Sequence, residues 1–289
     1  MKLSPFELHR PGSLAEAGEL LERLGDEAAV YCGGTELLLV AKLGLTDFTS
    51  LVDVKGIPEL RGVSANGELR IGAAVTHREL ERSETVRSSW PALAGMERDV
   101  GNVRVRNTGT IGGNLCFADP HSDPATFLLA AGAEVALRRG AGPERRLAIE
   151  EFVRGPYDTA LEPAELLVSV HVPRLPAGTP LVHRKISFRE RPAITVAVRL
   201  DISDGGVAAA RIAVGSVAAR PLRPAGAEDL LRGSELGSLG DDELRAAGDV
   251  AAEAVEPMED LNGSAEYKRQ LVRVVTTRAL RDAVGEATR

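Results

Sequence analysis

Two short glycine-rich segments contain the residues best suited to holding a ligand. One is Cys32-Gly-Gly-Thr-Glu36 and the other is Thr110-Ile-Gly-Gly-Asn114. Glycine pairs lack Cβ atoms, so the backbone can approach an anion closely and present its N–H groups to it. Polar side chains beside both pairs add further hydrogen-bonding groups. We therefore predict two turns that converge on the diphosphate of one dinucleotide.

The usual nucleotide-binding motifs are missing from the chain. A Rossmann site needs G-x-G-x-x-G after the first strand, and a P-loop needs Gly-Lys-Ser/Thr at its end. The sequence has neither. A lone glycine pair more often marks only a tight turn. Two pairs with polar flanks favour ligand binding over that alternative.

Two polar residues downstream have both a binding and a purely structural interpretation. Asp123 is suited to accepting a hydrogen bond from a ribityl or ribose hydroxyl, or to capping the helix that begins at Pro124. Lys185 is either a cation that leans over a cofactor or a solvated residue at a strand end. Both interpretations stay open at this stage.

No catalytic residue and no metal site are predicted. Asp119, His121 and Asp123 alternate along the chain, but Pro120 interrupts a regular strand there and no further ligands accompany them. Cys32 and Cys116 lack a base partner in the sequence, so each is expected to be a small buried side chain.

Composition indicates a folded protein that does not bind nucleic acid. The 289 residues carry a net charge of −7, and no basic stripe with interleaved aromatic residues is present. No window approaches the ~18 consecutive apolar residues of a membrane span, and the N-terminus lacks the apolar region of a signal peptide. We therefore expect a cytoplasmic protein whose two cysteines are reduced.

Hydrophobic periodicity predicts an α+β protein with a boundary in the Pro- and Gly-rich stretch 174–180. Before that stretch, helices are expected at 14–24, 35–42, 77–82, 90–100 and 124–131, and strands at 28–31, 49–54, 68–75, 133–138 and 166–172. After it, strands are expected at 181–186, 193–202 and 207–217, and helices at 225–231, 241–254 and 265–284.

Taken in order, these segments resemble the FAD-binding medium subunit of molybdenum hydroxylases, the xanthine dehydrogenase and aerobic carbon monoxide dehydrogenase family. The similarity runs nearly from end to end. Beyond the glycine segments, it is carried by the stretches 69–76, 165–173, 214–217, 221–223 and 267–269.

The resemblance implies a two-part FAD-binding domain of the vanillyl-alcohol oxidase (PCMH) type at 1–176, with subdomains at about 1–58 and 59–176. A smaller α+β C-terminal domain of the carbon monoxide dehydrogenase flavoprotein type follows at 177–289. The implied FAD-binding residues are Tyr31, Cys32, Gly33, Gly34, Thr35, Glu36, Leu37, Thr110, Ile111, Gly112, Gly113, Asn114, Ser122, Asp123, Leu167 and Lys185.

The family's function implies an oxidoreductase subunit within a hetero-oligomer. A small partner subunit would carry 2Fe-2S clusters, and a large partner subunit would hold the molybdopterin cofactor that oxidises the substrate. FAD in this chain would pass the electrons to NAD or another acceptor. The carbon monoxide dehydrogenase branch of the family tends to have serine where this chain has Glu36, so the resemblance favours the xanthine dehydrogenase branch. The alternatives are a carbon monoxide dehydrogenase medium subunit, a stand-alone flavin oxidase and a flavin-free assembly protein.

Overall fold

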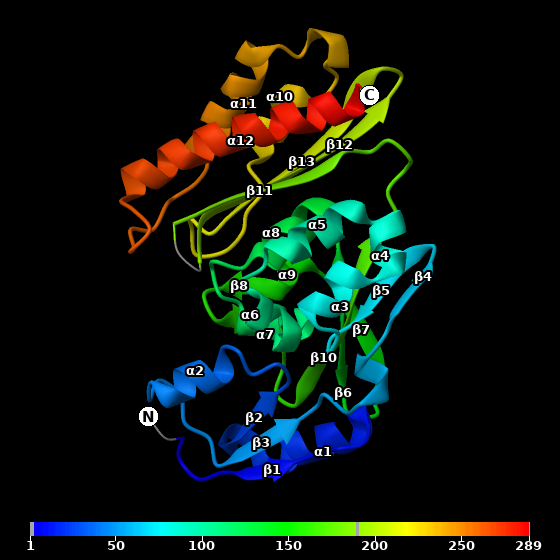
Figure 1. Cartoon of the computed structure of the whole chain (residues 1–289), viewed down its shortest axis with the longest axis vertical. Helices are drawn as coiled ribbons and strands as arrows, with labels where there is room; N and C mark the ends of the chain where they lie inside the picture. The colour runs from blue at the N-terminus through cyan, green and yellow to red at the C-terminus, as the bar shows by residue number, and fades with distance from the viewer. Residues whose placement is uncertain (1–2, 189–190, 289) are drawn as a thin grey trace. The chain divides into compact units, whose positions relative to one another are not determined.

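The computed structural model describes residues 3–188 and 191–288, and these form two compact units (Figure 1). The first unit consists of Met1–Ala118 and Glu134–Val172, and the second consists of Asp119–Ala133 and Pro173–Arg289. Each unit contains sheets and helices, so the predicted α+β class is confirmed.

The first unit begins with a small parallel sheet. Its order is β1-β3-β2, and α1 packs its apolar side chains against it. The Ser13 hydroxyl caps α1 by accepting a hydrogen bond from the Glu16 N–H at 3.2 Å. The bounds are β1 (Glu7–His9), α1 (Leu14–Leu24), β2 (Ala28–Tyr31), α2 (Leu37–Lys42) and β3 (Ser50–Asp53), with a 3-10 turn at Gly25–Glu27.

A second sheet of five strands, in the order β4-β5-β10-β6-β7, completes the core of this unit. Its strands are β4 (Val63–Asn66), β5 (Glu68–Gly72), β6 (Glu134–Arg139), β7 (Glu144–Ala148) and β10 (Glu165–Pro173). The accompanying elements are a 3-10 turn (Pro58–Leu60), α3 (His77–Arg82), α4 (Glu84–Ser89), α5 (Pro91–Asp99), α6 (Val103–Thr108), α7 (Ile111–Phe117), α9 (Ile149–Phe152), β8 (Val153–Gly155) and β9 (Asp158–Thr159). Gly67, at a φ of 78°, forms the turn between β4 and β5.

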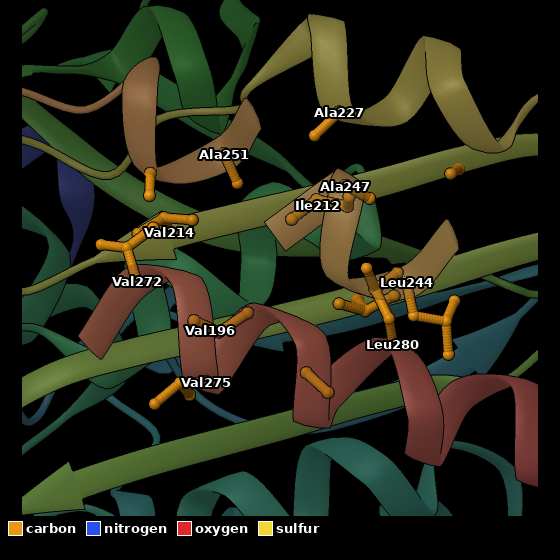
Figure 2. Packing of buried hydrophobic residues seen from close by; sticks show 14 of the residues in the cluster. Val196, Ile212, Val214, Ala227, Leu244, Ala247, Ala251, Val272, Val275 and Leu280 are labelled. Atoms are coloured by element: carbon orange, nitrogen blue, oxygen red, sulfur yellow. The ribbon is translucent and has the colours of Figure 1, made fainter. Parts of the chain in front are cut away.

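The second unit is built on an antiparallel sheet of β11 (Leu181–Ser187), β12 (Pro192–Ser203) and β13 (Gly206–Gly215). One face is covered by α10 (Ala225–Leu231), α11 (Asp241–Glu253) and α12 (Ala265–Ala287). Figure 2 shows side chains of these helices, such as Leu244 and Val272, gathered with Val196 and Val214 of the strands. A 3-10 turn at Leu236–Ser238 precedes α11.

α8 (Asp123–Ala131) also packs against this sheet, although it lies between α7 and β6 in the sequence. Its Thr126 Oγ1 lies 2.9 Å from Thr195 Oγ1 of β12, which in turn lies 3.2 Å from Ser216 Oγ. Thr195 contacts α8, whereas Val196 packs with α10 to α12. Neighbouring residues of a strand point to opposite faces of the sheet. The helix α8 and the helices α10 to α12 therefore cover opposite faces of the sheet.

None of the helices in the described part of the chain is long and apolar enough to cross a membrane.

Candidate cofactor site

The carboxyl ends of two parallel strands place the first glycine segment. Tyr31, the last residue of β2, pairs with Asp53, the last residue of β3. Ligands commonly bind where such strand ends meet. Lys55 follows β3, and its Nζ atom lies 3.7 Å from the centre of the Tyr31 ring and 2.9 Å from Asp53 Oδ1. A cation therefore stands next to the predicted anion-binding turn.

Glycine is required at both positions of the first pair, for different reasons. Gly34 has a φ of 69°, a conformation that side chains other than glycine rarely adopt, and a Cβ there would overlap the Tyr31 ring. A Cβ at Gly33 would overlap the carbonyl oxygen of Thr108 and lie 2.8 Å from the Cα atom of Gly109. The two glycine segments thus converge, because Thr108 and Gly109 directly precede the second one.

The first segment also presents unused hydrogen-bond donors. In the part of the chain that the structure describes, the backbone N–H groups of Gly34 and Thr35 have no hydrogen-bond acceptor. The Gly34 carbonyl, in contrast, accepts from the Leu38 N–H of α2 at 3.2 Å. Half-buried N–H groups need partners, and two adjacent ones suit an anion.

The second segment differs from the predicted turn with free N–H groups, and that part of the prediction is wrong. Gly112 and Gly113 lie in the first turn of α7. The Gly112 N–H donates to the Ala73 carbonyl at 3.0 Å, and the Gly113 N–H donates to Thr110 Oγ1 at 3.1 Å. Gly112 is needed for packing, because its Cβ would lie 2.7 Å from the Ala73 carbonyl oxygen.

Backbone hydrogen bonds join the stretch 73–77 to the second glycine segment and to Gly109 before it. The Ile111 N–H donates to the Val75 carbonyl at 3.0 Å, and the His77 N–H donates to the Gly109 carbonyl at 3.1 Å. His77 and Glu97 are both buried, and His77 Nδ1 lies 2.7 Å from Glu97 Oε2. This pair ties the stretch 73–77 to α5, and thereby holds Gly109 against Gly33.

A pocket of about 740 Å³ opens at this junction within the first unit, within the range of small-molecule sites, roughly 300–1,000 Å³. Among the described residues that line it, four are cations and one, Glu79, is acidic, so the lining is strongly cationic. The Glu79 carboxylate is already bound to the Thr76 N–H at 2.7 Å and to its hydroxyl at 2.8 Å. The cations in the lining are Lys55, Arg61, Arg78 and Arg82.

The structure places the predicted residues in four groups. Tyr31, Cys32, Gly33 and Thr110 line the pocket itself. The other residues of the glycine segments adjoin them in sequence, namely Gly34, Thr35, Glu36, Leu37, Ile111, Gly112, Gly113 and Asn114. Leu167 is buried in β10. Ser122, Asp123 and Lys185 belong to the second unit.

Within the second unit, Asp123 and Lys185 form a buried ion pair. Asp123 Oδ2 lies 2.6 Å from Lys185 Nζ, and the exposed fractions of the two side chains are 5% and 14%. The structure assigns the capping role to Ser122, whose hydroxyl accepts from the Ala125 N–H at 3.3 Å. Asp123 therefore does not cap α8, and it is the first residue of the helix. Lys185 is not a solvated strand-end residue.

His183 lies beside this pair, with Nε2 4.0 Å from Asp123 Oδ1. Burial, followed by the charge of Lys185, lowers the pKa of His183 to about 4. As the pH falls from about 6.5, the unfolded chain binds a proton that the folded chain does not, so the free energy of unfolding falls by up to ~1.4 kcal/mol per pH unit. Urea unfolding between about pH 6.5 and pH 4.5 should show this loss in the wild type and not in His183→Leu. Parallel curves would contradict it.

Neither thiol is poised for nucleophilic attack. Burial raises the pKa of Cys32, although a hydrogen bond with Thr110 acts in the opposite direction. Burial, with a smaller contribution from Cys32, raises the pKa of Cys116 to about 12. Both cysteines are free. Among the described residues, no group of three or more His, Cys, Asp or Glu side chains is arranged to hold a metal.

The sequence prediction missed the cations of the pocket and the His77–Glu97 pair. A signal for Lys55 was present, since it follows a predicted strand in the way that Cys32 follows another. Of the remaining cations, Arg61 lies just before β4, and Arg78 and Arg82 lie on α3. Nothing in their local sequence distinguishes them from solvated arginines.

Comparison with known families identifies the class of protein that has this fold and pocket as FAD-binding. Residues 4–175 match the model of the FAD binding domain in molybdopterin dehydrogenase, and residues 188–283 match the CO dehydrogenase flavoprotein C-terminal domain. The chain therefore belongs to the family of FAD-binding subunits of molybdenum hydroxylases.

Named relatives cover the chain almost completely. The carbon monoxide dehydrogenase medium chain of Hydrogenophaga pseudoflava is 34% identical, with 96% of each chain covered. A solved structure of that carbon monoxide dehydrogenase, which lacks the Mo-pyranopterin moiety of its cofactor, matches with a TM-score of 0.94 over 99% of both chains. The xanthine dehydrogenase FAD-binding subunit of Escherichia coli O157:H7 is 29% identical, with 96% of each chain covered.

These identities do not support the predicted tilt toward xanthine dehydrogenase. That tilt relied on Glu36, a single position beside the first glycine pair, whereas the carbon monoxide dehydrogenase chain is more similar over the whole length.

Proposed function

We propose that this chain is the electron-exit subunit of a molybdenum hydroxylase complex. It would bind FAD non-covalently and pass electrons from 2Fe-2S clusters in a small partner subunit to NAD or another external acceptor. A large partner subunit with the molybdopterin cofactor would oxidise the substrate. The relatives are named as medium chains, which supports a multi-subunit assembly. The cytoplasmic location stays a prediction.

One observation carries the proposal, namely the junction of the two glycine segments at a cationic pocket. FAD, when bound, supplies the redox chemistry of the site. Gly34 and Thr35 would hold the diphosphate through their N–H groups, and Lys55 would balance its negative charge. Gly33 would allow Gly109 to approach. The second glycine segment would act as a support, since its N–H groups are already bonded within the protein.

The other sequence-derived assignments remain part of this proposal. Asp123, Leu167 and Lys185 would lie on the flavin side of the cofactor. The domain limits of 1–176 and 177–289 also remain proposals about folding units. No substrate is proposed, because medium chains of enzymes for carbon monoxide and for nicotine are both at least 30% identical to this chain.

Two rival functions fit the structure less well. A flavin-free assembly protein has no use for the adjacent N–H groups of Gly34 and Thr35, which have no acceptor among the described residues. A stand-alone flavin oxidase would need a general base near the cofactor. Within the described pocket lining, the only carboxylate is Glu79, and it is occupied with Thr76.

Purification of the tagged chain from its native host tests the proposal. We expect a large molybdenum protein and a small 2Fe-2S protein to accompany it. A panel of purines, aldehydes and carbon monoxide should contain a substrate that bleaches the flavin absorbance of the whole complex. Removing the small subunit should abolish that bleaching. A chain that purifies alone and oxidises an alcohol by itself would contradict the proposal and favour the oxidase.

A further inference from the structure

In the second unit, His121 lies between two carboxylates. Its Nδ1 atom is 3.2 Å from Asp119 Oδ1, and its Nε2 atom is 2.9 Å from Asp260 Oδ2. A carboxylate only accepts hydrogen bonds, so both ring nitrogens must carry protons to make both contacts. The arrangement therefore selects the charged imidazolium.

Two further cations bind these carboxylates. Arg191, which directly precedes β12, bonds to Asp119. Lys268 of α12 is completely buried, and its Nζ atom lies 2.7 Å from Asp260 Oδ2. Charges of alternating sign thus run through Arg191, Asp119, His121, Asp260 and Lys268. We call these five residues the His121 clamp.

The electrostatics of the clamp agree with its geometry. Hydrogen bonds to Asp119 and then to Asp260 raise the pKa of His121 above its usual value, although burial opposes the shift. Burial alone would raise the pKa of Asp260, but hydrogen bonds led by that of Lys268 lower it to about 2. The geometry and the raised pKa of His121 therefore both favour the charged clamp, and the clamp weakens as the pH rises through that pKa.

The clamp holds the segment that leads into Asp123. The Asp119 carbonyl accepts from the Ser122 N–H at 3.0 Å, and Asp119 Oδ1 accepts from the His121 N–H at 2.9 Å. The Pro120 carbonyl accepts from the Ser216 N–H at 3.2 Å. Asp123 begins α8 directly after this anchored turn. Its position therefore depends on where the clamp fixes the segment 119–122.

We propose that His121 is a positioning residue for FAD, and that its loss of a proton loosens the segment 119–122 and weakens FAD binding. This inference rests on the proposed role of Asp123 in holding FAD. A neutral imidazole has one N–H group, so one ring nitrogen then turns a lone pair toward a carboxylate. If FAD binds only to chains in which all contacts of the His121 clamp are made, the measured Kd rises in inverse proportion to the fraction of such chains.

Titration of the full-length chain with FAD, followed by quenching of flavin fluorescence from about pH 6 to about pH 9, tests this inference. Loss of one charge-assisted hydrogen bond predicts a Kd that rises roughly tenfold in the wild type. His121→Gln should bind weakly at every pH in this range. His121→Lys keeps the charge and should bind tightly at every pH, which a merely structural role of the ring would not produce.

A matched control is His171→Gln. The His171 ring contacts a single carboxylate, Glu68, at 2.8 Å, and the Ser169 hydroxyl at 2.9 Å, so its neutral form satisfies both contacts. This variant should keep the wild-type pH dependence. Circular dichroism confirms that each variant is folded, and Asp260→Asn, which removes one carboxylate charge, should reproduce the weak binding if His121→Gln fails to fold.

Binding that is independent of pH in the wild type, or equally pH-dependent in His121→Gln, would overturn the inference while leaving the proposed function intact. A wild-type chain that binds no FAD at any pH would overturn the proposed function itself.

Discussion

Gly33→Ala is expected to weaken FAD binding by about tenfold to a hundredfold. The added Cβ would overlap the carbonyl oxygen of Thr108, which is backbone and cannot rotate away as a side chain can. Overpacking of this kind costs about 1–3 kcal/mol, which corresponds to that range of affinity. The cost falls on FAD binding because relief requires Thr108 and Gly109 to move away from the first glycine segment. Flavin fluorescence titration measures the effect.

Gly56→Ala is the matched control for this variant. Gly56 follows Lys55 at the same edge of the sheet, and a Cβ there would meet no atom within 4 Å. The control should bind FAD as the wild type does, and it should unfold at the same temperature. Wild-type affinity in Gly33→Ala would show that the approach of the two segments is not needed for the site.

Glu97→Leu is expected to lower the free energy of unfolding by about 3–5 kcal/mol. Glu97 and His77 are almost fully buried with 2.7 Å between Oε2 and Nδ1, and removal of one partner of a buried pair leaves the other without compensation. Glu97 also holds His77, whose N–H donates to the Gly109 carbonyl, so FAD affinity should fall as well. Urea unfolding by circular dichroism measures the stability.

Glu162→Leu serves as the comparison, because its partner Arg139 lies at 3.3 Å and the Glu162 side chain is 63% exposed. Exposed pairs contribute ~0–1 kcal/mol, so this variant should differ little from the wild type. Equal and small losses in the two variants would mean that the buried pair does not hold the stretch 73–77 in place.

Much of the fold follows from local sequence patterns. The predicted helix 265–284 and strand 193–202 correspond to α12 and β12, because long apolar repeats identify such elements without knowledge of their partners. Thr76 caps α3 through an equally local pattern, because its hydroxyl accepts from the Glu79 N–H three residues later at 3.1 Å. These signals act within a few residues of chain.

The second glycine segment shows where local patterns fail. A glycine pair has low helix propensity, so a turn was the reasonable prediction. In the structure, Gly112 lies in α7, its N–H donates to the Ala73 carbonyl, and Ala73 occupies the space where a Cβ would lie. Tertiary packing therefore decides the conformation, and the approach of Ala73 has no counterpart in the sequence near Gly112.

The cationic lining of the pocket was also beyond prediction from sequence. Lys55 follows β3, Arg61 precedes β4, and Arg78 and Arg82 lie on α3. Arg78 and Arg82 are four residues apart on one helix, but neither shares a spacing with Lys55 or Arg61, and the three elements meet only through the tertiary fold. In the structure they line one pocket together with Cys32 and Gly33.

Direct titration of the purified full-length chain with FAD tests the central claim most directly. The account predicts saturable binding of one FAD per chain, with quenched flavin fluorescence. At a free FAD concentration of about a hundred times the Kd, the chain should gain ~2.7 kcal/mol in the free energy of unfolding. A folded chain that neither quenches flavin fluorescence nor gains stability on addition of FAD would contradict it.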